Sequence, residues 1–400
     1  MDNGLLDKVK TYFDGCLRRL AVQQRLDQEE AIQLQPSLFW VGGFPAHYMG
    51  ELHARLQAIY PGLFFLYVSL GERGQAFSHE VTRLPSAHIQ VSSRIWFLWT
   101  WRYLERMRPR GVLVAGNYPR ANLVAAVWAI YRGRDLYYLA DSNPLDRRNL
   151  ERKWLSRFWH RQMFGRVTKI LCIGTRNAEF YMQYLPKQRL VDILLPFPLP
   201  HLAHLFEAVS SKRGEVFVFL VFGRLEKIKA VDRVISAYAL LSSKYQQRSR
   251  LLIAGEGAAR DTLESQVETL GLRERVDFLG MVSSEKAPQV FGEAHALIVA
   301  SHDEPWGLVV NEALSAGVPV IGPFWVGAFA DLVVPGKTGL VTLDNSPQKL
   351  AKAMQVLLDN PDQADGMGKA GRELVRTRGW TIEGSVKAFG NLPVLKEIQR

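Results

Sequence analysis

The sequence predicts an α/β protein with two Rossmann-like domains that face a central cleft. The chain has 400 residues, enough for two domains of ordinary size, and 48% hydrophobic with 22% charged residues is typical of a packed protein. From Ser37 onward, short apolar runs alternate with helical stretches, as in the βαβ units of a parallel sheet. Near residues 196–214, the Pro-rich run LLPFPLPHL followed by SSKRGE interrupts this alternation, because proline stops both helices and sheet ladders.

The first half is predicted to contain a helical segment, residues 1–35, and a Rossmann-like domain, residues 36–205. Within residues 4–20, apolar side chains recur at spacings of three and four, which predicts an amphipathic helix. Lysines and arginines beside it would suit a membrane surface, and docking on its own domain is the alternative. We expect strands near residues 37–41, 64–69, 111–115, 136–140, 168–173 and 191–195.

The second half, residues 206–380, is predicted to form a second domain with a Rossmann-like sheet. We expect its strands at residues 215–221, 250–253, 275–279, 295–300, 318–321 and 339–342. A last segment, residues 381–400, follows this domain.

The net charge of +11 is unevenly distributed. Residues 1–205 hold 27 Lys and Arg against 16 Asp and Glu, whereas residues 206–400 hold 23 of each. Seven of the ten tryptophans also lie in the first half, several of them in the run RIWFLWTWRYLERMRPR at residues 94–110. Basic residues mixed with tryptophan suit an anionic membrane or acceptor. A solvated surface or a buried amphipathic helix is the alternative, and no nucleic-acid motif accompanies the charge, so no nucleic-acid partner is expected.

The sequence offers little support for metal or disulfide chemistry. Cys16 and Cys172 are the only cysteines, too few and too far apart for a zinc site or a disulfide framework, and we expect both to be reduced. No run of eighteen apolar residues occurs, and the N-terminus lacks the apolar core of a signal peptide. We therefore expect a cytoplasmic protein, with the inner face of the cell membrane as its candidate docking surface.

The first segment that carries chemistry follows the strand at 215–221. The strand leads to Gly223, a short loop with Arg224 and Lys229, and then a helix. Ligands of open α/β sheets collect at the carboxyl ends of strands, and two cations there suit a diphosphate. The alternative is that both side chains are solvated or paired with Glu226 or Asp232.

The second segment is HALIVASHDEPWGLVVNEALSAGVPVIG, which reads as strand, loop, helix and strand. If Gly307 opens the helix, the amides of Leu308 and Val309 are donors for a phosphate oxygen. Glu312, one turn further on, is placed to accept hydrogen bonds from ribose hydroxyls, and Glu304 can reach the sugar beyond the phosphates. The two cations of the preceding loop would compensate these carboxylates.

These segments resemble the retaining glycosyltransferases of family 4 (group 1), which have the GT-B fold. The resemblance is closest over residues 217–342 and rests on GRLEKIK, AGEG at 254–257, VDFLG at 276–280, the Glu-x7-Glu element and VPGKTGLV. It implies that Arg224 and Lys229 hold the donor diphosphate, and that Glu304 contacts the transferred sugar. It further implies distal-phosphate contacts by the Leu308 and Val309 amides, ribose contacts by Glu312, and a base site at Gly280 and Met281.

The resemblance also implies that the last segment, residues 381–400, crosses back to the first domain. In the first half the resemblance is looser. Gly42 and Gly43 stand where the family's first strand meets its glycine loop, and KILCIGTRNAEFYMQYL resembles the unit before its interdomain linker. For the acceptor side we name Asn117, Asp141 and Ser142, since the histidine that many members contribute has no evident match. Two departures adjoin the donor segments: Ala230 replaces a usual glycine, and Trp306 a common phenylalanine.

The resulting hypothesis is a glycosyltransferase that moves a sugar from a nucleotide-diphosphate sugar to a glycan or lipid-linked acceptor. Retention is implied by the resemblance, and the absence of any Asp-x-Asp argues against a metal-bridged enzyme, so no cofactor and no metal are expected. The alternatives are a sugar-nucleotide epimerase, an inverting transferase, or a non-catalytic nucleotide-sugar-binding subunit.

Overall fold

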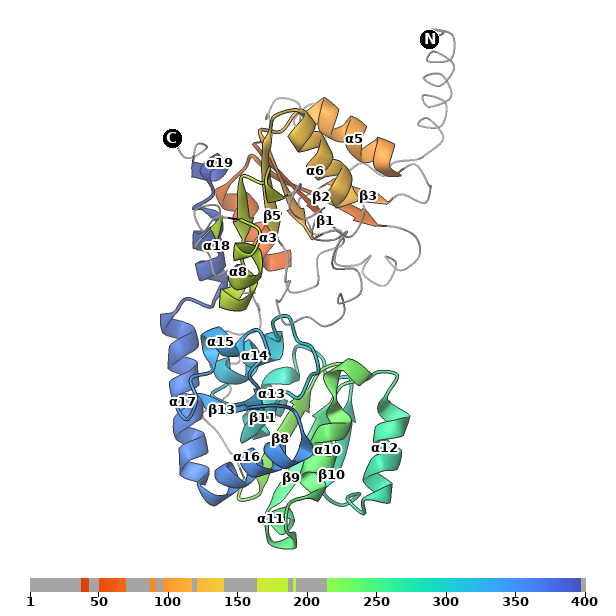
Figure 1. The fold of residues 1–400 in the computed structure, drawn as a ribbon, viewed down its shortest axis with the longest axis vertical. Coiled ribbons are helices and arrows are strands. Elements are labelled where there is room, and N and C mark those ends of the chain that lie inside the picture. The colour runs from red at the N-terminus through yellow and green to blue at the C-terminus, as the bar shows by residue number, and fades with distance from the viewer. Residues whose placement is uncertain are drawn as a thin grey trace. The chain divides into compact units, whose positions relative to one another are not determined.

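The structure is a computed structural model that describes residues 37–42, 50–69, 87–90, 96–116, 121–139, 164–185, 190–191 and 214–396. These residues form two compact units (Figure 1). The first unit contains the described residues up to Leu136, and the second runs from Tyr137 to Lys396. The expected helix at residues 4–20 lies outside the described residues. The predicted domain boundaries at residues 35, 205 and 380 stay predictions.

Seven strands form the first sheet, in the order β3-β2-β1-β4-β5-β6-β7. Their bounds are β1 Leu38–Gly42, β2 Leu63–Ser69, β3 Ala87–Gln90, β4 Gly111–Ala115, β5 Asp135–Leu139, β6 Lys169–Leu171 and β7 Leu190–Val191. The helices between them are α3 Gly50–Ile59, α5 Trp96–Met107, α6 Ala121–Tyr131 and α8 Gly174–Met182. β1 pairs in parallel with β2 and β4, and its five residues are all buried, as expected for a strand covered on both faces.

The second sheet has six strands in the order β10-β9-β8-β11-β12-β13, and every neighbouring pair is parallel. Their bounds are β8 Phe217–Phe222, β9 Ser249–Ala254, β10 Val276–Gly280, β11 Ala296–Ile298, β12 Val320–Pro323 and β13 Gly339–Thr342. The helical elements up to β12 are η5 Lys227–Lys229, α10 Val231–Ala239, α11 Ser243–Gln247, α12 Arg260–Thr269, α13 Ala287–Glu293 and α14 Leu308–Ser315. The remaining helices are α15 Phe329–Leu332, α16 Pro347–Asp359, α17 Pro361–Thr377, α18 Ile382–Phe389 and α19 Pro393–Lys396.

The helices pack in two groups around the second sheet. α10 contacts α12 and α16, and α14 contacts α15 and α17 (Figure 1). Phe219 and Ile253 from the strands pack with Ile235 of α10 and Met354 of α16 in one buried apolar cluster. Burying side chains of this size stabilises the fold by about 1.5–3 kcal/mol each. This core fixes the carboxyl ends of the strands, where the predicted site residues lie.

The predicted strands agree with the observed ones in number and order, apart from β3, which the sequence did not indicate. The expected strand at 295–300 is shorter, Ala296–Ile298, because the chain leaves the sheet at Val299 to form the loop that carries Glu304. The strand expected at 191–195 is described only as Leu190–Val191. Val394 of α19 donates its amide hydrogen to Tyr137 Oη of β5 at 3.4 Å, so the C-terminal residues contact a strand of the first sheet.

Candidate functional site

The loop that follows β8 is held by the end of the neighbouring strand β9 and by the loop that follows β9. Gly223 N donates to Ala254 O at 2.9 Å, and Leu225 N donates to Glu256 O at 2.8 Å. A Cβ atom at Gly255 would lie 1.8 Å from Gly223 O, so only glycine allows these two backbones to approach so closely. The AGEG motif therefore fixes the path of the GRLEKIK segment.

Lys229 lies at the end of the short helix η5 and points to Glu304. Its Nζ atom is 2.6 Å from Glu304 Oε2, and the Glu304 side chain is only 11% exposed. The next residue, Ala230, has the left-handed conformation with φ 50° and ψ 41°, which turns the chain into α10. A cation and an acid 75 residues apart in sequence are thus brought together.

Several hydrogen bonds hold the loop that carries Glu304. His302 N donates to Ile228 O at 2.8 Å, which ties this loop to η5. Ser301 Oγ donates a hydrogen bond to Glu304 Oε2 at 3.0 Å, so this carboxylate accepts hydrogen bonds from both the hydroxyl of Ser301 and the ammonium group of Lys229. Trp325 Nε1 donates to Ser301 O at 2.9 Å and supports the loop from the other side. Glu304 is therefore oriented in advance of any ligand.

Gly307 is the N-cap of α14 and has φ 96°, a conformation that other residues adopt only at a cost. A Cβ atom here would lie 3.1 Å from Glu304 Cγ and 3.3 Å from Val326 Cγ1. Val310 N donates to Gly307 O at 2.9 Å, so the amides of Leu308 and Val309 precede the first hydrogen bond of the helix and lie at its positive end. The geometry therefore offers donors for an anion beside the Lys229–Glu304 pair.

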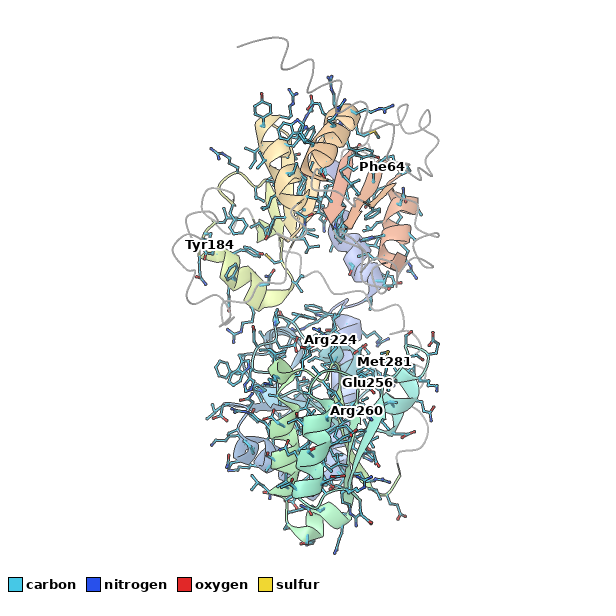
Figure 2. All side chains as sticks on the ribbon, turned by 90° about the vertical axis from the view of Figure 1, so that its right-hand side faces the viewer. Phe64, Tyr184, Arg224, Glu256, Arg260 and Met281 are labelled. Atoms are coloured by element: carbon cyan, nitrogen blue, oxygen red, sulfur yellow. The ribbon has the colours of Figure 1, made fainter. Side chains whose placement is uncertain are left out.

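Arg224 is placed on the same loop as Lys229 but has a different partner. Its side chain is 75% exposed and its Nη1 atom lies 3.4 Å from Glu226 Oε1. This pairing is the alternative that the sequence left open for Arg224. Gly280 lies at the end of β10, where Gly255 N donates to its carbonyl at 2.8 Å, and the Met281 side chain that follows is 81% exposed (Figure 2).

The other predicted positions divide into described and undescribed ones. Glu312 lies on α14, half-buried, and Gly42 ends β1. Gly43, Asn117, Asp141 and Ser142 lie outside the described residues. The roles assigned to all these residues stay predictions.

Sequence reasoning missed two groups that organise the site. Ser301 precedes Glu304 by three residues, and a hydroxyl at that spacing before a carboxylate could have drawn attention to it. The second group is Trp306 with Asn311, whose Oδ1 accepts a hydrogen bond from the indole Nε1 at 2.9 Å. Trp306 also stacks on Trp380, with ring centroids 4.9 Å apart. No sequence pattern connects Trp306 to a residue 74 positions later.

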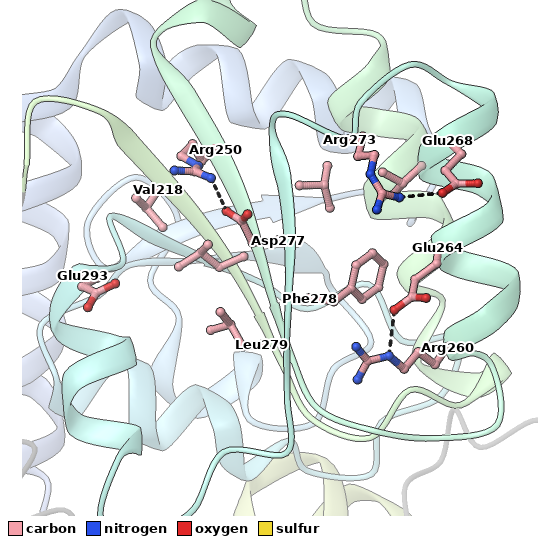
Figure 3. Close-up of a pocket in the computed structure, with 13 residues that line it drawn as sticks. Val218, Arg250, Arg260, Glu264, Glu268, Arg273, Asp277, Phe278, Leu279 and Glu293 are labelled. Carbon is pink, nitrogen blue, oxygen red and sulfur yellow. Dashed lines mark hydrogen bonds and ion pairs between the residues drawn. The ribbon is translucent and has the colours of Figure 1, made fainter.

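A cavity of about 690 Å³ lies along the edge strand β10 (Figure 3). Three arginines line it, and each has an acidic partner: Arg250 with Asp277, Arg260 with Glu264, and Arg273 with Glu268. None of the predicted site residues lines it. Its charges are already compensated, so it offers no unpaired cation for a diphosphate.

Two observations concern metals and membranes. Within the described ranges, no three His, Cys, Asp or Glu side chains gather as a metal site would require. No helix in the described part of the chain has both the length and the apolar character needed to cross a bilayer.

Comparison with known proteins shows what this chain is similar to. Residues 205–374 match the family model of the glycosyl transferases group 1, the family that the motifs of this segment resemble. The D-inositol 3-phosphate glycosyltransferase of Streptomyces coelicolor is 31% identical over 174 residues, which are 42% of this chain and 38% of that protein. The chain thus spans about two fifths of this curated relative.

Solved structures extend the likeness of fold to both domains. The structure of Anabaena Alr3699/HepE in complex with UDP and glucose has a TM-score of 0.69 at 16% identity, over 88% of this chain and 98% of that chain. Sucrose-phosphate synthase from Thermosynechococcus elongatus has a TM-score of 0.67 at 17% identity, over 91% of this chain and 99% of that one. The predicted GT-B fold, with two parallel-sheet α/β domains, is confirmed.

Proposed function

We propose that this protein is a glycosyltransferase that moves a sugar from a nucleotide-diphosphate sugar to a glycan or lipid-linked acceptor, with retention and without a metal. The observation that carries the proposal is the Lys229–Glu304 ion pair, 2.6 Å long, beside the start of α14. The group 1 family match of residues 205–374 agrees with it. The UDP and glucose in the Anabaena structure make a nucleotide-diphosphate sugar the natural donor class.

In such a transfer, the bond between the anomeric carbon and the diphosphate breaks, and negative charge grows on the leaving oxygen. Lys229 and Arg224 would supply positive charge, and the amides of Leu308 and Val309 would donate hydrogen bonds. Donors fixed in advance stabilise the transition state without reorganisation, and losing one typically lowers the rate about 100-fold to 1,000-fold. This stabilisation is also why the proposal needs no metal.

The two acids have separate roles in the proposal. Glu304, held by Ser301 and Lys229, would accept hydrogen bonds from the transferred sugar. Glu312, one turn into α14, would accept those of the ribose hydroxyls. When a diphosphate arrives, Lys229 can contact both the phosphate and Glu304, so that Glu304 keeps its counter-charge.

The membrane part of the proposal concerns helix α5 and its neighbour α6. Tyr131 is 70% exposed at the end of α6, its ring lies 5.8 Å from that of Trp101, and the Arg132 guanidinium lies 5.4 Å from it. Arginine next to exposed aromatic side chains is the composition of an interfacial surface. We propose that the protein acts in the cytoplasm at the inner face of the membrane, where a lipid-linked acceptor would be found.

A donor screen tests this function. UDP-, GDP- and ADP-sugars are added to the full-length protein, and one of them should raise its melting temperature, because a ligand of the native state stabilises that state. The stabilising donor is then incubated with a lipid-linked acceptor extract, and the anomeric configuration of the product is determined by NMR. No stabilisation by any nucleotide sugar would reject the donor site. Stabilisation without turnover would indicate a non-catalytic subunit, and an inverted product would reject retention.

A further inference from the structure

A polar cavity of about 290 Å³ lies in the first unit, where α5 and α6 end. It is lined by Glu105, Arg108, Trp128, Arg132 and Arg134. The strands β4 and β5 begin next to it, so it lies at the amino ends of these strands. Ligands of open α/β sheets are expected at the other edge, where the strands end. The cavity therefore does not belong to the predicted donor site and does not rest on the proposed function.

Glu105 organises one side of this cavity. Its Oε2 atom accepts hydrogen bonds from Trp128 Nε1 at 3.0 Å and from Arg132 Nε at 3.0 Å, and Arg132 Nη2 pairs with Oε1. The Trp128 hydrogen bond, followed by the arginine contacts, lowers the pKa of Glu105 from its usual value, so this carboxylate is ionised at neutral pH. The hydrogen bonds that its two oxygens accept come from Trp128 and Arg132.

The side chains of Arg108 and Arg134 form no such hydrogen bond with a carboxylate among the described residues. Arg108 donates from Nε to the Glu105 carbonyl at 3.4 Å, and its Nη atoms make no hydrogen bond among the described residues. The Arg134 side chain also has no hydrogen bond or ion pair within the described part of the chain. Guanidinium groups stay protonated at any physiological pH, so they cannot relieve their mutual repulsion by losing a proton.

The cavity keeps a net positive charge even when the negative ends of the two helices are included. α5 and α6 both end at the cavity, and each C-terminus contributes roughly half a negative charge. Together with ionised Glu105 this gives about two negative charges against three arginines. A net charge of about +1 is left in a concave site, which favours an anion.

The backbone of Arg108 indicates that its side chain has a purpose beyond ending α5. It has φ 45° and follows the last residue of the helix, where Arg108 N donates to Leu104 O at 2.8 Å. Glycine is the usual residue at this position because any other residue costs roughly 1–2 kcal/mol in the left-handed conformation. α6 shows the favourable arrangement, with Gly133 at φ 61°. If the end of α5 needed only closing, glycine would do so without strain.

We propose that this cavity is a binding site for a phosphate group, held by the guanidinium groups of Arg108, Arg132 and Arg134. Arginine binds phosphate through paired N–H donors, and Arg108 and Arg134 have such donors available. The phosphate can belong to an anionic lipid headgroup or to a free phosphorylated metabolite. Exposed Tyr131 beside Arg132 makes a lipid headgroup the source to test first.

Hydrogen–deuterium exchange of the full-length protein tests the site, because it reports location as well as binding. Inorganic phosphate should slow exchange in peptides that cover residues 104–110 and 130–136. Arg108→Gly and Arg134→Gln should each weaken the phosphate affinity about tenfold or more, as expected for a lost charge-assisted hydrogen bond. Arg108→Gly removes the guanidinium while relieving the backbone, so it should fold at least as well as the wild type. Arg376→Gln, an equal change of charge on exposed α17, is the control and should bind like the wild type.

Vesicles identify the source of the phosphate. The site takes a lipid phosphate if phosphatidylglycerol vesicles bind the wild type but not the Arg108→Gly variant, while phosphatidylcholine vesicles bind neither protein. If inorganic phosphate protects both peptides but vesicle binding is the same for the wild type and Arg108→Gly, it takes a soluble phosphate. The proposal would be overturned if inorganic phosphate did not slow hydrogen–deuterium exchange in these two peptides. It would also be overturned if phosphate slowed exchange as much in both Arg108→Gly and Arg134→Gln as in the wild type.

Discussion

Asp331 of α15 accepts two hydrogen bonds from Thr175 at the start of α8, although 156 residues separate them. The Thr175 amide lies 2.8 Å from Oδ2, and its hydroxyl lies 2.6 Å from Oδ1. The first amides of a helix have no acceptor within it, so Asp331 caps α8 from another segment of the chain. Arg378 then donates to the Asp331 carbonyl at 2.8 Å, which joins the end of α17 to the same point.

Asp331→Ala should therefore lower the free energy of unfolding by about 2–3 kcal/mol, since it leaves two donors of Thr175 without their buried acceptor. Urea unfolding measures this change. Glu274→Ala is the control, because Glu274 is exposed and its removal should change the stability by less than about 0.5 kcal/mol. Equal stability of the two variants would show that the cap contributes nothing.

Asp331 also predicts a pH dependence. Burial raises its pKa above the ordinary value of 3.8, and the two bonds from Thr175 offset only part of that rise. Between pH 3.8 and the raised pKa the folded state holds a proton that the unfolded state has released. This contribution to stability is therefore greatest at low pH and decreases as the pH rises through that window. Asp331→Asn should flatten this part of the stability profile, and an unchanged profile would contradict the prediction.

The buried His53 of the first unit should make the stability rise with pH, the opposite of the dependence expected for Asp331. It is 2% exposed, its ring stacks on Phe65 at 4.1 Å, and burial lowers its pKa from 6.5 to about 3. The unfolded chain takes up a proton at higher pH than the folded one. This term therefore favours unfolding increasingly as the pH falls from 6.5 towards 3, by up to about 5 kcal/mol. His53→Phe keeps an aromatic ring at this position and should move acid unfolding to lower pH, as followed by circular dichroism.

The two acids of the candidate donor site should differ in their kinetic effects. Glu304→Ala should lower kcat about 100-fold or more with little change in donor affinity, since its proposed contact strengthens in the transition state. Glu312→Ala should weaken donor binding about tenfold or more, because a ribose contact is equal in the ground and transition states. Initial rates and calorimetric titration with the donor measure both. Wild-type kinetics in both variants would remove the site assignment.

Ala230 offers a test of backbone strain beside Lys229. Its left-handed conformation costs roughly 1–2 kcal/mol, and the greater freedom of glycine in the unfolded chain offsets part of this. Ala230→Gly should thus be as stable as the wild type or about 1 kcal/mol more stable. Ala230→Val should be at least about 2 kcal/mol less stable, since it adds two buried methyl groups to an unfavourable conformation. Equal urea midpoints for the two variants would contradict this account.

Much of the fold could be predicted from the sequence because its signals are local. Strands β8 and β9 are apolar runs of the length that a covered parallel strand needs, and the glycines of AGEG mark where two backbones approach. β3 was missed because AHIQ is short and has only one strongly apolar residue, Ile89. The left-handed Ala230 was noted in the sequence only as a departure from glycine, since alanine gives no signal of such a conformation.

Local sequence signals were enough to predict the two parallel-sheet domains, the loop position of Glu304 and the glycine that opens α14, because each depends on neighbours a few residues away. The packing of the whole chain sets which side chains meet. It pairs Lys229 with Glu304 and leaves Arg224 with Glu226, it caps α8 with Asp331, and it gathers three arginines at the ends of α5 and α6. Such pairings depend on how distant strands and helices pack, and no local pattern of residues records that packing.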